Sequence, residues 1–392
     1  MRSLSKYDVF FYLSQMEAPT KEELIKFLRR NAFFEHVSER TVSKKLNELK
    51  KEKLLKGIQI NTENPKTYDC LAFLCWARMK GKEYNRLLDK KSALLFKTLF
   101  ENGPLNFKEI VKKTGLSKPT LIKYIGTFTE NGVFSVIKKK PLVLKANLND
   151  LTLFYANFLD LSFELFEKQF GKADIPKISS KKLISATIKL HVHSTTVTEG
   201  NTATEDDVER VFGDYPVKLT PREVTEILNA RSAINEVFSI CKKDINIEEI
   251  KHLHRILMNN LLEKPGEFYY GRKRLAGFET KLPSSKQEID FSMAALLNFA
   301  GKPINPVIIS PMVHFIFASV HPFADGNGRV ARLMHSWILL KAGLPLFVFD
   351  PKKRNEYFAL LEKSRNESIE DFINFCIKEH RNSLEELMKK EA

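Results

Sequence analysis

Twelve consecutive residues carry the groups that phosphoryl-type transfer needs. The segment runs from His321 to Arg332 and reads HPFADGNGRVAR. A neutral imidazole at His321 could accept a hydroxyl proton at pH 7, and the Asp325 carboxylate is a hard oxygen ligand that suits Mg²⁺. Gly326 and Gly328 carry no Cβ, so their backbone N–H groups could closely approach a bound anion.

Two arginines and two helices complete this arrangement. The apolar run 313–320 predicts a helix that holds His321 rigidly, and the run 330–342 predicts a second helix after the loop. The loop would therefore present an anion to a helix N-terminus, where unpaired N–H groups attract it. Arg329 and Arg332 are three residues apart, which places both on one helical face within reach of phosphate oxygens. Base, metal ligand, anion site and cations together indicate phosphoryl-type transfer.

The segment resembles the Fic family signature, H-P-F-x-[D/E]-G-N-G-R-x-x-R, and it matches at every defined position. The resemblance extends over roughly residues 183–386 and includes LHRIL at 253–257 and KPGEF at 264–268. It implies a protein adenylyltransferase, an enzyme that transfers AMP from ATP to a hydroxyl side chain of a target protein. In that reaction His321 would deprotonate the target hydroxyl, which would attack the α-phosphate of ATP.

The resemblance also implies roles for the residues around His321. Asp325 would bind Mg²⁺ or Mn²⁺ between the α- and β-phosphates. Tyr357 lies where family members place an aromatic ring near adenine, and packing within its own helix is the alternative. The loop residues expected to contact the nucleotide phosphates are Gly326, Asn327, Gly328, Arg329 and Arg332.

A second motif precedes the loop. STTVTEGN at 194–201 resembles the family's inhibitory motif, [S/T]-x-x-x-E-[G/N], through Thr195, Glu199 and Gly200. Its place ahead of the signature is typical of the class whose inhibitory helix is amino-terminal within the core. In that class the glutamate pairs with the second arginine, here Arg332, which would occupy the partner of the γ-phosphate and misplace the α-phosphate. The same glutamate could instead position a water that removes AMP from a modified target, and the sequence leaves this open.

Residues 274–283 resemble the family's flap, a β-hairpin beside the active site. An exposed strand edge there could bind the backbone of a target protein by β-strand addition and leave its hydroxyl near His321. An ordinary surface hairpin is the alternative. The residues expected to dock the target are Leu275, Ala276, Gly277 and Phe278.

Nearly all the excess positive charge lies in the first 150 residues. The whole chain has 63 Lys and Arg against 48 Asp and Glu, a net charge of +15. Residues 1–150 hold 30 Lys and Arg against 16 Asp and Glu, a net charge of +14. The remaining residues hold 33 Lys and Arg against 32 Asp and Glu, a net charge of +1. A basic region concentrates polyanions and supplies phosphate contacts that weaken with salt. Charge alone does not establish nucleic-acid binding, so the pattern of elements has to decide.

Two segments of this basic region read as helix, turn, helix and hairpin, the plan of a winged helix. In the second segment, the runs 92–102, 106–114 and 118–130 predict helices, and a small hairpin surrounds the basic triplet 138–140. The first segment follows the plan more loosely.

In the first segment, the sequence predicts helices at 20–30 and 39–52, with Ser38 as the cap of the second. Wing strands are predicted at 54–60 and 68–73. A winged helix binds DNA when its second helix offers polar side chains to base edges and cations to phosphates. A winged helix used for protein contact or dimerisation is the alternative. The residues expected to contact DNA are Arg40, Lys44, Lys118, Thr120 and Lys123.

These patterns predict a mainly α chain, with an all-helical Fic core and a small β-hairpin flap, preceded by two winged-helix (α+β) modules. The expected boundaries are 1–80 and 88–148 for the two modules, 149–183 for a helical connector, and 184–388 for the Fic catalytic domain, with the inhibitory motif at 195–200.

The composition favours a soluble protein without a membrane span. Hydrophobic residues make up 43% of the chain and charged residues 28%, and no apolar run approaches the ~20 residues that cross a bilayer. The charges at Lys6 and Asp8 come too early for a signal peptide. We therefore expect a cytoplasmic location. The cysteines lack zinc-type spacing and read as free thiols, and they are Cys70, Cys75, Cys241 and Cys376.

The leading hypothesis is a protein adenylyltransferase restrained by Glu199. Its substrate would be ATP, its cofactor Mg²⁺ or Mn²⁺, and its partner a protein with a Ser, Thr or Tyr hydroxyl. DNA is a second expected partner, through residues 1–150, and a homodimer stays open. One alternative is a DNA-binding regulator whose Fic core senses nucleotide. Another is phosphoryl transfer, against which Gly328 argues because the family's kinase branch tends to lose this glycine.

Overall fold

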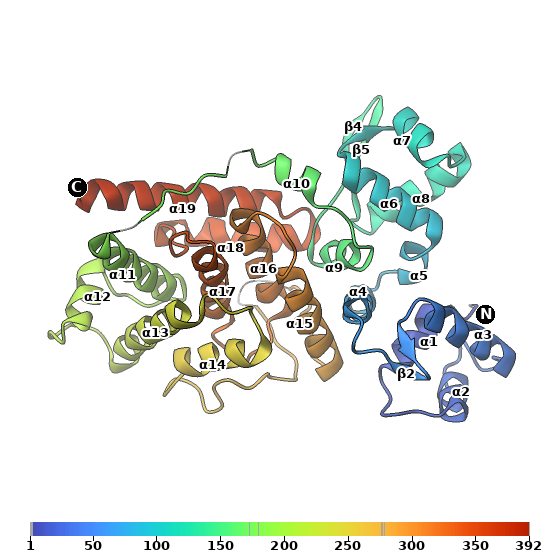
Figure 1. Ribbon diagram of the computed structural model, residues 1–392, viewed down its shortest axis with the longest axis horizontal. Helices are drawn as coiled ribbons and strands as arrows, with labels where there is room; N and C mark the ends of the chain where they lie inside the picture. Colours follow the sequence, from blue (N-terminus) through green and yellow to red (C-terminus); the bar gives the residue numbers. More distant parts are fainter. Residues whose placement is uncertain (1–2, 172, 179, 276, 278, 392) are drawn as a thin grey trace. The chain divides into compact units, whose positions relative to one another are not determined.

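Helices form most of the chain (Figure 1), and capping side chains set where many of them begin. In α13 (Pro221–Ile240), Thr220 accepts a hydrogen bond from the backbone N–H of Glu223, and the Glu223 carboxylate accepts one from the Thr220 N–H. Caps of this kind stabilise a helix by about 1 kcal/mol each. The computed structural model describes residues 3–171, 173–178, 180–275, 277 and 279–391.

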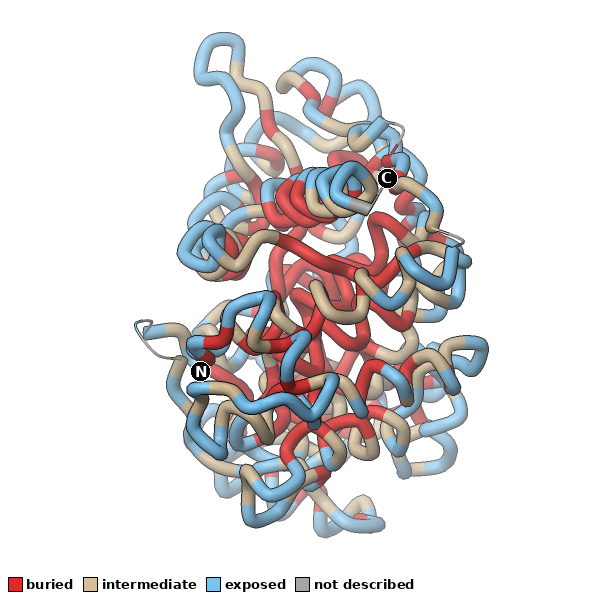
Figure 2. Tube along the Cα trace, turned by 90° about the vertical axis from the view of Figure 1, so that its left-hand side faces the viewer, coloured by how far each residue is buried: buried red, intermediate tan, exposed pale blue. Residues whose placement is uncertain are grey.

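Contacts divide the chain into two compact units. The first unit holds residues 1–146, 151–161 and 285–298, and the second holds residues 147–150, 162–284 and 299–392. In Figure 2, buried positions lie on the inward sides of the elements, and exposed positions lie on outer turns and loops. No helix among the described residues is both long enough and apolar enough to cross a membrane. The mainly α class expected from the sequence is confirmed.

The first unit begins with helices that the sequence largely predicted. The helices expected at 20–30 and 39–52 are confirmed, and Ser38 caps the second by accepting a hydrogen bond from the Thr41 N–H. Leu55 pairs with Ile60 in a short antiparallel hairpin. The elements are α1 (Lys6–Leu13), α2 (Lys21–Arg29), α3 (Glu39–Lys51), β1 (Leu55–Lys56), β2 (Gln59–Ile60) and α4 (Pro65–Met79).

The predicted wing strand at 68–73 is wrong, because these residues lie inside α4. Asn64 caps this helix by accepting a hydrogen bond from the Lys66 N–H, and Pro65 occupies its first turn, where a proline fits a helix best. Apart from Tyr68, residues 67–77 are buried. A helix that is buried on all sides shows no 3.6-residue pattern, so its apolar run is hard to distinguish from a buried strand.

The order of elements predicted for residues 92–144 is present in the structure. β4 pairs antiparallel with β5, with Phe134 opposite Ala146, and β3 joins the other edge of β5. The rings of Phe96 and Phe128 each stack on Phe134 in the core. The winged-helix assignment itself stays a prediction. The elements are α5 (Tyr84–Leu87), α6 (Lys90–Asn102), β3 (Leu105–Asn106), α7 (Phe107–Thr114), α8 (Lys118–Glu130), β4 (Phe134–Lys139) and β5 (Leu142–Ala146).

Two later helices complete the core of the first unit. In α9 (Asp150–Phe158), the ring of Tyr155 stacks on Phe73 of α4 with centroids 4.8 Å apart. In α15 (Lys286–Ala300), Ser292 accepts a hydrogen bond of 2.8 Å from the Trp76 indole. The first unit therefore includes segments far from the amino terminus in sequence.

The second unit is built around α16 (Pro306–Val320), a helix whose residues 307–320 are all buried. α17 (Asn327–Lys341) packs against it and is buried along most of its length. This pair therefore gives the intervening loop a rigid base. The surrounding elements are α10 (Glu164–Lys168), α11 (Lys181–Thr198), α12 (Glu205–Phe212), α13, α14 (Ile247–Leu257), η1 (Pro351–Lys353), α18 (Arg354–Asn366) and α19 (Glu370–Glu391).

Candidate active site

The loop between α16 and α17 turns at two residues with left-handed backbone conformation. His321 ends α16 with a φ of 52°, and Gly326 precedes α17 with a φ of 77°. The loop leads directly into the first turn of α17 at Asn327, as the sequence predicted. A Cβ on Gly326 would lie 2.8 Å from the Met258 sulfur, so the backbone conformation and the available space both favour glycine there.

The Asn327 side chain holds the loop together through two hydrogen bonds to its backbone. Its Oδ1 accepts a hydrogen bond from the Phe323 N–H, and its Nδ2 donates one to the Phe323 carbonyl, both at 2.9 Å. The side chain is buried. The side-chain amide is therefore committed to the loop, and the expected contact of Asn327 with an anion falls to its backbone N–H.

His254 of α14 supports the same loop, a role that sequence reasoning missed. Its Nδ1 accepts a hydrogen bond of 2.7 Å from the Gly266 N–H, which leaves Nε2 to donate at 2.9 Å to the Asp325 carbonyl. Its ring also stacks on Phe323, with centroids 3.7 Å apart. Burial lowers the pKa of His254 to about 4, so the ring is neutral at pH 7 and fits this bonding pattern. The only sequence signal for this role was the place of His254 in the LHRIL segment.

His321 is in the neutral form that proton acceptance requires. Burial, and next the charge of Lys273, lower the pKa of His321 to about 4. Its Nδ1 lies 3.4 Å from the Ala318 carbonyl, which favours a proton on Nδ1 and leaves Nε2 as the acceptor. The Lys273 ammonium donates at 2.6 Å to the carbonyl oxygen of His321 itself. The unusual backbone of His321 is thus held by a cation from the segment before α15.

Glu199 pairs with Arg332, as the inhibitory motif implied. Glu199 is the C-cap of α11, and its Oε1 lies 2.5 Å from Nη2 of Arg332. The Arg332 Nε also donates to the Thr195 hydroxyl at 2.7 Å, and Nη2 donates to the Thr195 carbonyl at 3.2 Å. Arg332 is 1% exposed, so this pair is strong and well fixed. Gly200 follows with a φ of 107°, which lets the chain leave the helix.

Gly328 lies directly beneath the Glu199 carboxylate. A Cβ added to Gly328 would lie 2.5 Å from Oε1 of Glu199 and 3.4 Å from Nη1 of Arg332. Even a methyl group would therefore collide with the carboxylate. The glycine that the sequence assigned to anion binding also makes room for the glutamate in this structure.

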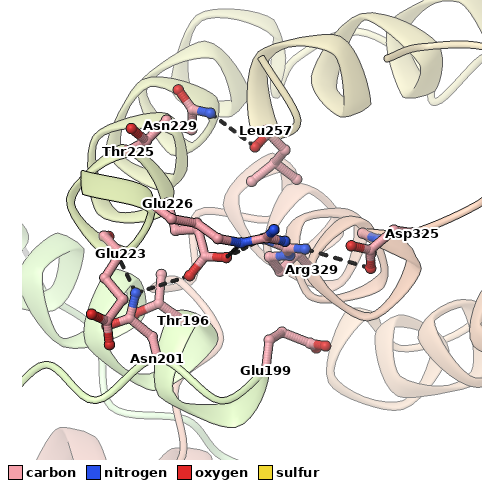
Figure 3. A network of polar contacts seen from close by, with 12 residues as sticks. Thr196, Glu199, Asn201, Glu223, Thr225, Glu226, Asn229, Leu257, Asp325 and Arg329 are labelled. Carbon is pink, nitrogen blue, oxygen red and sulfur yellow. Dashed lines mark hydrogen bonds and ion pairs between the residues drawn. The ribbon is translucent and has the colours of Figure 1, made fainter. Parts of the chain in front are cut away.

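Arg329 does not share the environment of Arg332. Its Nη1 lies 3.9 Å from Oε1 of Glu226 in α13, and its Nη2 lies 3.6 Å from Oδ1 of Asp325 (Figure 3). The side chain is 5% exposed. The two arginines that were expected to grip phosphates are thus each paired with a glutamate from a different helix.

A cavity of about 610 Å³ opens beside the loop. His321, Asp325, Gly328 and Glu199 line it, so the expected base, metal ligand, anion loop and inhibitory carboxylate face one space. Cations line it as well, and they are Arg274, Arg354 and Arg365. This volume lies within the range of small-molecule sites, so a nucleotide is a suitable occupant.

Tyr357 combines the two interpretations that its sequence allowed. It lines the cavity, but its side chain is 1% exposed and its ring stacks on Phe349 with centroids 5.1 Å apart. Its hydroxyl pairs with Nε2 of His314 at 2.7 Å and with Nη1 of Arg332 at 3.4 Å. Packing is therefore established for Tyr357, and contact with adenine stays a prediction.

The expected flap can be followed only in part. Leu275 and Gly277 line the cavity, whereas Ala276 and Phe278 lie outside the described residues. The described residues of 274–283 have no strand assignment, so the hairpin stays a prediction. Just before this segment, the Tyr269 N–H donates to the Pro322 carbonyl at 2.9 Å, which joins the segment to the active-site loop.

Asp325 suits a divalent cation through its chemistry and exposure. Its side chain is 51% exposed on the cavity, while Oδ1 accepts a hydrogen bond of 2.6 Å from the Gly326 N–H. No group of three or more His, Cys, Asp or Glu residues among the described positions could enclose a metal. A cation at Asp325 would therefore need phosphate oxygens as further ligands, which is how Mg²⁺ is usually bound beside nucleotides.

The residues expected to contact DNA lie in the first unit, on α3 and α8. Arg40, Lys44, Lys118 and Lys123 are exposed, and Thr120 is half-buried with its hydroxyl 2.9 Å from that of Ser117. Exposed apolar residues lie on α8 and on β4 of the same unit. Ile122 of α8 is 65% exposed and Ile137 of β4 is 57% exposed, a composition that also suits a protein contact.

Residues 244–339 match the model of the Fic/DOC family. The chain contains a Fic domain. The matched residues include α14, α16, the active-site loop and most of α17, so His254, His321, Asp325 and Arg332 all belong to it. Glu199 and Tyr357 lie outside the matched residues.

Curated relatives of this Fic domain are similar over about half of the chain. The protein adenylyltransferase Fic of Nematostella vectensis is 26% identical over 230 residues, which are 55% of this chain and 53% of the relative. The protein adenylyltransferase fic-1 of Caenorhabditis elegans is 25% identical over 217 residues, 52% of this chain and 42% of the relative. The chain thus spans about half the length of the relatives it matches.

Solved structures of Fic proteins resemble the chain more distantly. The crystal structure of a Fic family protein from Desulfovibrio desulfuricans has a TM-score of 0.46 at 24% identity, covering 54% of this chain and 67% of that one. The structure of Fic-1 from C. elegans, residues 134–508, has a TM-score of 0.49 at 17% identity, and the match covers 94% of this chain and 99% of that one. The assignment of the Fic domain therefore comes from the sequence match.

Proposed function

We propose that this chain is a protein adenylyltransferase that Glu199 holds in a restrained state. The observation that carries the proposal is the shared cavity: His321, Asp325 and the start of α17 border it, and Glu199 projects into it from α11. The cavity is large enough for a nucleotide, and its loop ends at a helix N-terminus that favours phosphate. The curated relatives that match over half of this chain are protein adenylyltransferases.

In the reaction, Nε2 of His321 takes the proton of a target hydroxyl. The hydroxyl oxygen then forms a bond to the α-phosphorus of ATP, the bond from that phosphorus to the bridging oxygen of the β-phosphate breaks, and pyrophosphate leaves. His321 suits the first step because it is neutral at pH 7 and because its Nδ1 faces the Ala318 carbonyl. Backbone N–H groups at the start of α17 would stabilise charge on the α-phosphate.

Mg²⁺ or Mn²⁺ would be held by Asp325 together with phosphate oxygens. When bound, such an ion neutralises phosphate charge. Arg332 would pair with the outer phosphates once Glu199 releases it, because a guanidinium binds phosphate and carboxylate in the same two-pronged way.

Glu199 would restrain the reaction in two ways: it pairs with Arg332, the expected partner of a phosphate, and it fills the space beside Gly328 that a phosphate would need. Its carboxylate is bonded to Arg332 and lies over Gly328, where an added Cβ would be only 2.5 Å away. A nucleotide phosphate that approached the loop would meet this negative charge. The carboxylate would therefore have to move before ATP binds productively. The same carboxylate could orient a water for removal of AMP from a target, which a modified target protein would reveal.

The proposal is tested with ATP labelled at either the α- or the γ-phosphate and incubated with the chain, Mg²⁺ and a cell lysate. We expect Glu199→Gly to raise protein labelling from α-labelled ATP at least tenfold, because the pair with Arg332 is lost. Glu263→Gly, at an exposed loop glutamate, is the matched control and should leave labelling unchanged. His321→Ala in the Glu199→Gly background should abolish labelling. Labelling from γ-labelled ATP instead would indicate a kinase and contradict the proposal.

A second proposed activity is DNA binding by residues 1–150. The support is the net charge of +14 in this region and the exposure of Lys118 and Lys123 on α8. Exposed Ile122 favours the alternative of a protein contact. With the full chain, we expect duplex affinity to fall steeply between 50 and 200 mM salt, roughly 10-fold or more for several phosphate contacts. Lys118→Gln with Lys123→Gln should flatten this dependence, and an affinity insensitive to salt would contradict DNA binding.

A further inference from the structure

Arg329 is a buried cation held loosely between two carboxylates. Figure 3 shows its guanidinium with Glu226 on one side and Asp325 on the other. The separations are 3.9 Å to Oε1 of Glu226 and 3.6 Å to Oδ1 of Asp325, both longer than a hydrogen bond. The Arg329 Nε is buried and has no hydrogen-bond partner in the described part of the chain. A guanidinium at nearly equal distance from two carboxylates is shared between them.

Glu226 is itself fixed in place. Its Oε2 accepts a hydrogen bond of 3.0 Å from Nδ2 of Asn201, and that same amide donates to the Glu223 carbonyl at 3.2 Å. Its Oε1 lies 3.4 Å from Nε of Arg222, one helical turn away. The side chain is 14% exposed. The buried side of α13 therefore presents a carboxylate of fixed position to Arg329.

Without this carboxylate, Asp325 would be the remaining partner of Arg329. The two residues are four positions apart, a spacing at which oppositely charged side chains meet readily at the start of a helix. A buried arginine that loses one of two carboxylates is driven toward the other, because an unpaired buried charge is costly. Asp325 would then be bonded to a guanidinium and would be a poorer ligand for a cation.

We propose that Glu226 is a positioning residue that draws Arg329 away from Asp325 and so keeps the Asp325 carboxylate available to a divalent cation. The proposal rests on the function proposed above, because it assigns a metal–nucleotide complex to this cavity. It goes beyond that function in giving a residue of α13, outside the loop and outside the inhibitory motif, control over metal binding. Asn201 supports it by fixing the Glu226 carboxylate from the segment that follows Glu199.

The alternative is that Glu226 only neutralises a buried cation and stabilises the fold. Both roles predict a lower melting temperature when Glu226 is changed, so stability does not separate them. They differ in the effect on metal binding and in the effect of removing Arg329. If Arg329 is the competitor for Asp325, then its removal should restore the metal affinity that the loss of Glu226 impairs.

The test measures Mn²⁺ binding by electron paramagnetic resonance in the full chain with α,β-methylene-ATP, which does not release pyrophosphate. All variants carry Glu199→Gly, so that the nucleotide can enter. We expect Glu226→Gln to weaken Mn²⁺ binding about tenfold, the lower end of what a lost partner of a metal ligand costs. The substituted amide retains one oxygen that can accept from Asn201, and it loses the charged oxygen that faces Arg222 and Arg329.

Three further variants decide between the two roles. Adding Arg329→Gln to Glu226→Gln should return the Mn²⁺ affinity to within about twofold of the parent, because energetic coupling of contacting residues is not additive. Arg329→Gln alone, measured at saturating nucleotide so that a lost phosphate contact does not limit loading, should not weaken Mn²⁺ binding, and this test does not require the Glu226 variant to fold. Glu236→Gln, in the same helix but away from its cap and without a contact to Arg329, is the matched control and should leave Mn²⁺ binding unchanged.

An unchanged Mn²⁺ affinity in Glu226→Gln, or a loss that Arg329→Gln does not reverse, would overturn the proposal. A parent that binds Mn²⁺ and nucleotide but labels no protein would contradict the proposed function and leave this inference standing. A parent that binds no Mn²⁺ with nucleotide would contradict both.

Discussion

At the scale of single residues, His321 shows how burial and a neighbouring cation set the chemistry of the site. A histidine with its ordinary pKa would be partly protonated near neutral pH and would lose part of its capacity as a base. Burial first, and then the Lys273 charge, lower the pKa of His321 to about 4. The ring is therefore unprotonated across the whole physiological range. The cost is a weaker base, which the anion site at α17 must offset by lowering the charge on the phosphate.

This environment has a measurable consequence for the pH profile of AMP transfer. His321 is a proton acceptor only above its pKa, so kcat/KM of Glu199→Gly should stay level from about pH 7.5 to 5.5 and show no inflection near the ordinary histidine pKa of about 6.5. Lys273→Met removes one cause of the lowered pKa of His321, so kcat/KM should begin to fall at a higher pH than in the parent. Lys273→Arg keeps the positive charge and should restore the level profile. Lys281→Met, at an exposed lysine of the same segment, is the control. An inflection at the ordinary histidine pKa in the parent would contradict a buried, neutral His321.

The sequence predicted the residue types of the loop better than their partners. His321, Asp325, Gly328 and Glu199 face one cavity, as the motif implied. The side chain of Asn327 instead binds the loop backbone, and Arg329 pairs with Glu226. The contact of Asn327 depends on the local shape of the loop, four residues from Phe323, and the contact of Arg329 depends on how α13 packs against α17, so neither partner could be read from residue types alone.

At the scale of elements, the end of α11 and the start of α17 interlock. The Glu199 carboxylate at the C-cap of α11 lies over Gly328 in the first turn of α17 and bonds to Arg332 one turn later. Helix ends leave backbone groups without intrahelical partners, so both ends depend on neighbouring side chains. This contact holds the inhibitory helix against the anion loop, and its release would open the loop to phosphate.

A double-mutant cycle tests this contact. Gly328→Ala places a methyl group 2.5 Å from Oε1 of Glu199, so it should displace the carboxylate and lower the melting temperature by several degrees, the effect of about 1–2 kcal/mol in a chain of this size. In the Glu199→Gly background the methyl group has room, and the same change should cost little. The measurement is the melting temperature of all four variants. Equal losses in both backgrounds would mean that Glu199 does not occupy this space.

Helix boundaries were predictable where a capping residue and a periodic pattern agreed, as in α3 and α7. The strand expected at 68–73 failed because α4 is buried on nearly all sides and has no amphipathic pattern. The sequence also could not predict that α15 belongs to the first unit. Its contact through Ser292 and Trp76 joins residues 216 positions apart, and no local signal reports such a pairing.

At the scale of the whole molecule, buried histidines are concentrated in the second unit. Burial lowers the pKa of His191 to about 4 and that of His380 to about 3, and it lowers the pKa values of His314 and His335 as well. His254 has a pKa of about 4 for the same reason. These imidazole rings are neutral in the folded chain, whereas the unfolded chain would protonate them below about pH 6.5. The free energy of unfolding therefore depends on pH.

The sign of the pH dependence follows from these shifts. Below about pH 6.5 the unfolded chain binds protons that the folded chain excludes, so the free energy of unfolding should fall as the pH is lowered. Each histidine that stays neutral contributes on the order of 1.4 kcal/mol per pH unit below that point. Urea unfolding of the full chain at about pH 7.5, 6.5 and 5.5 measures this slope. His380→Gln should reduce it and His36→Gln, at an exposed histidine, should not; a stability that is constant over this range would contradict the buried neutral cluster.

The most direct test of the central claim is the intact mass of Glu199→Gly after incubation with ATP and Mg²⁺. We predict that the chain, or a target protein added with it, gains the mass of one AMP and that pyrophosphate appears in equal amount. His321→Ala in the same background should gain nothing. A gain of a single phosphate, or no gain with either Mg²⁺ or Mn²⁺, would contradict AMP transfer by this site.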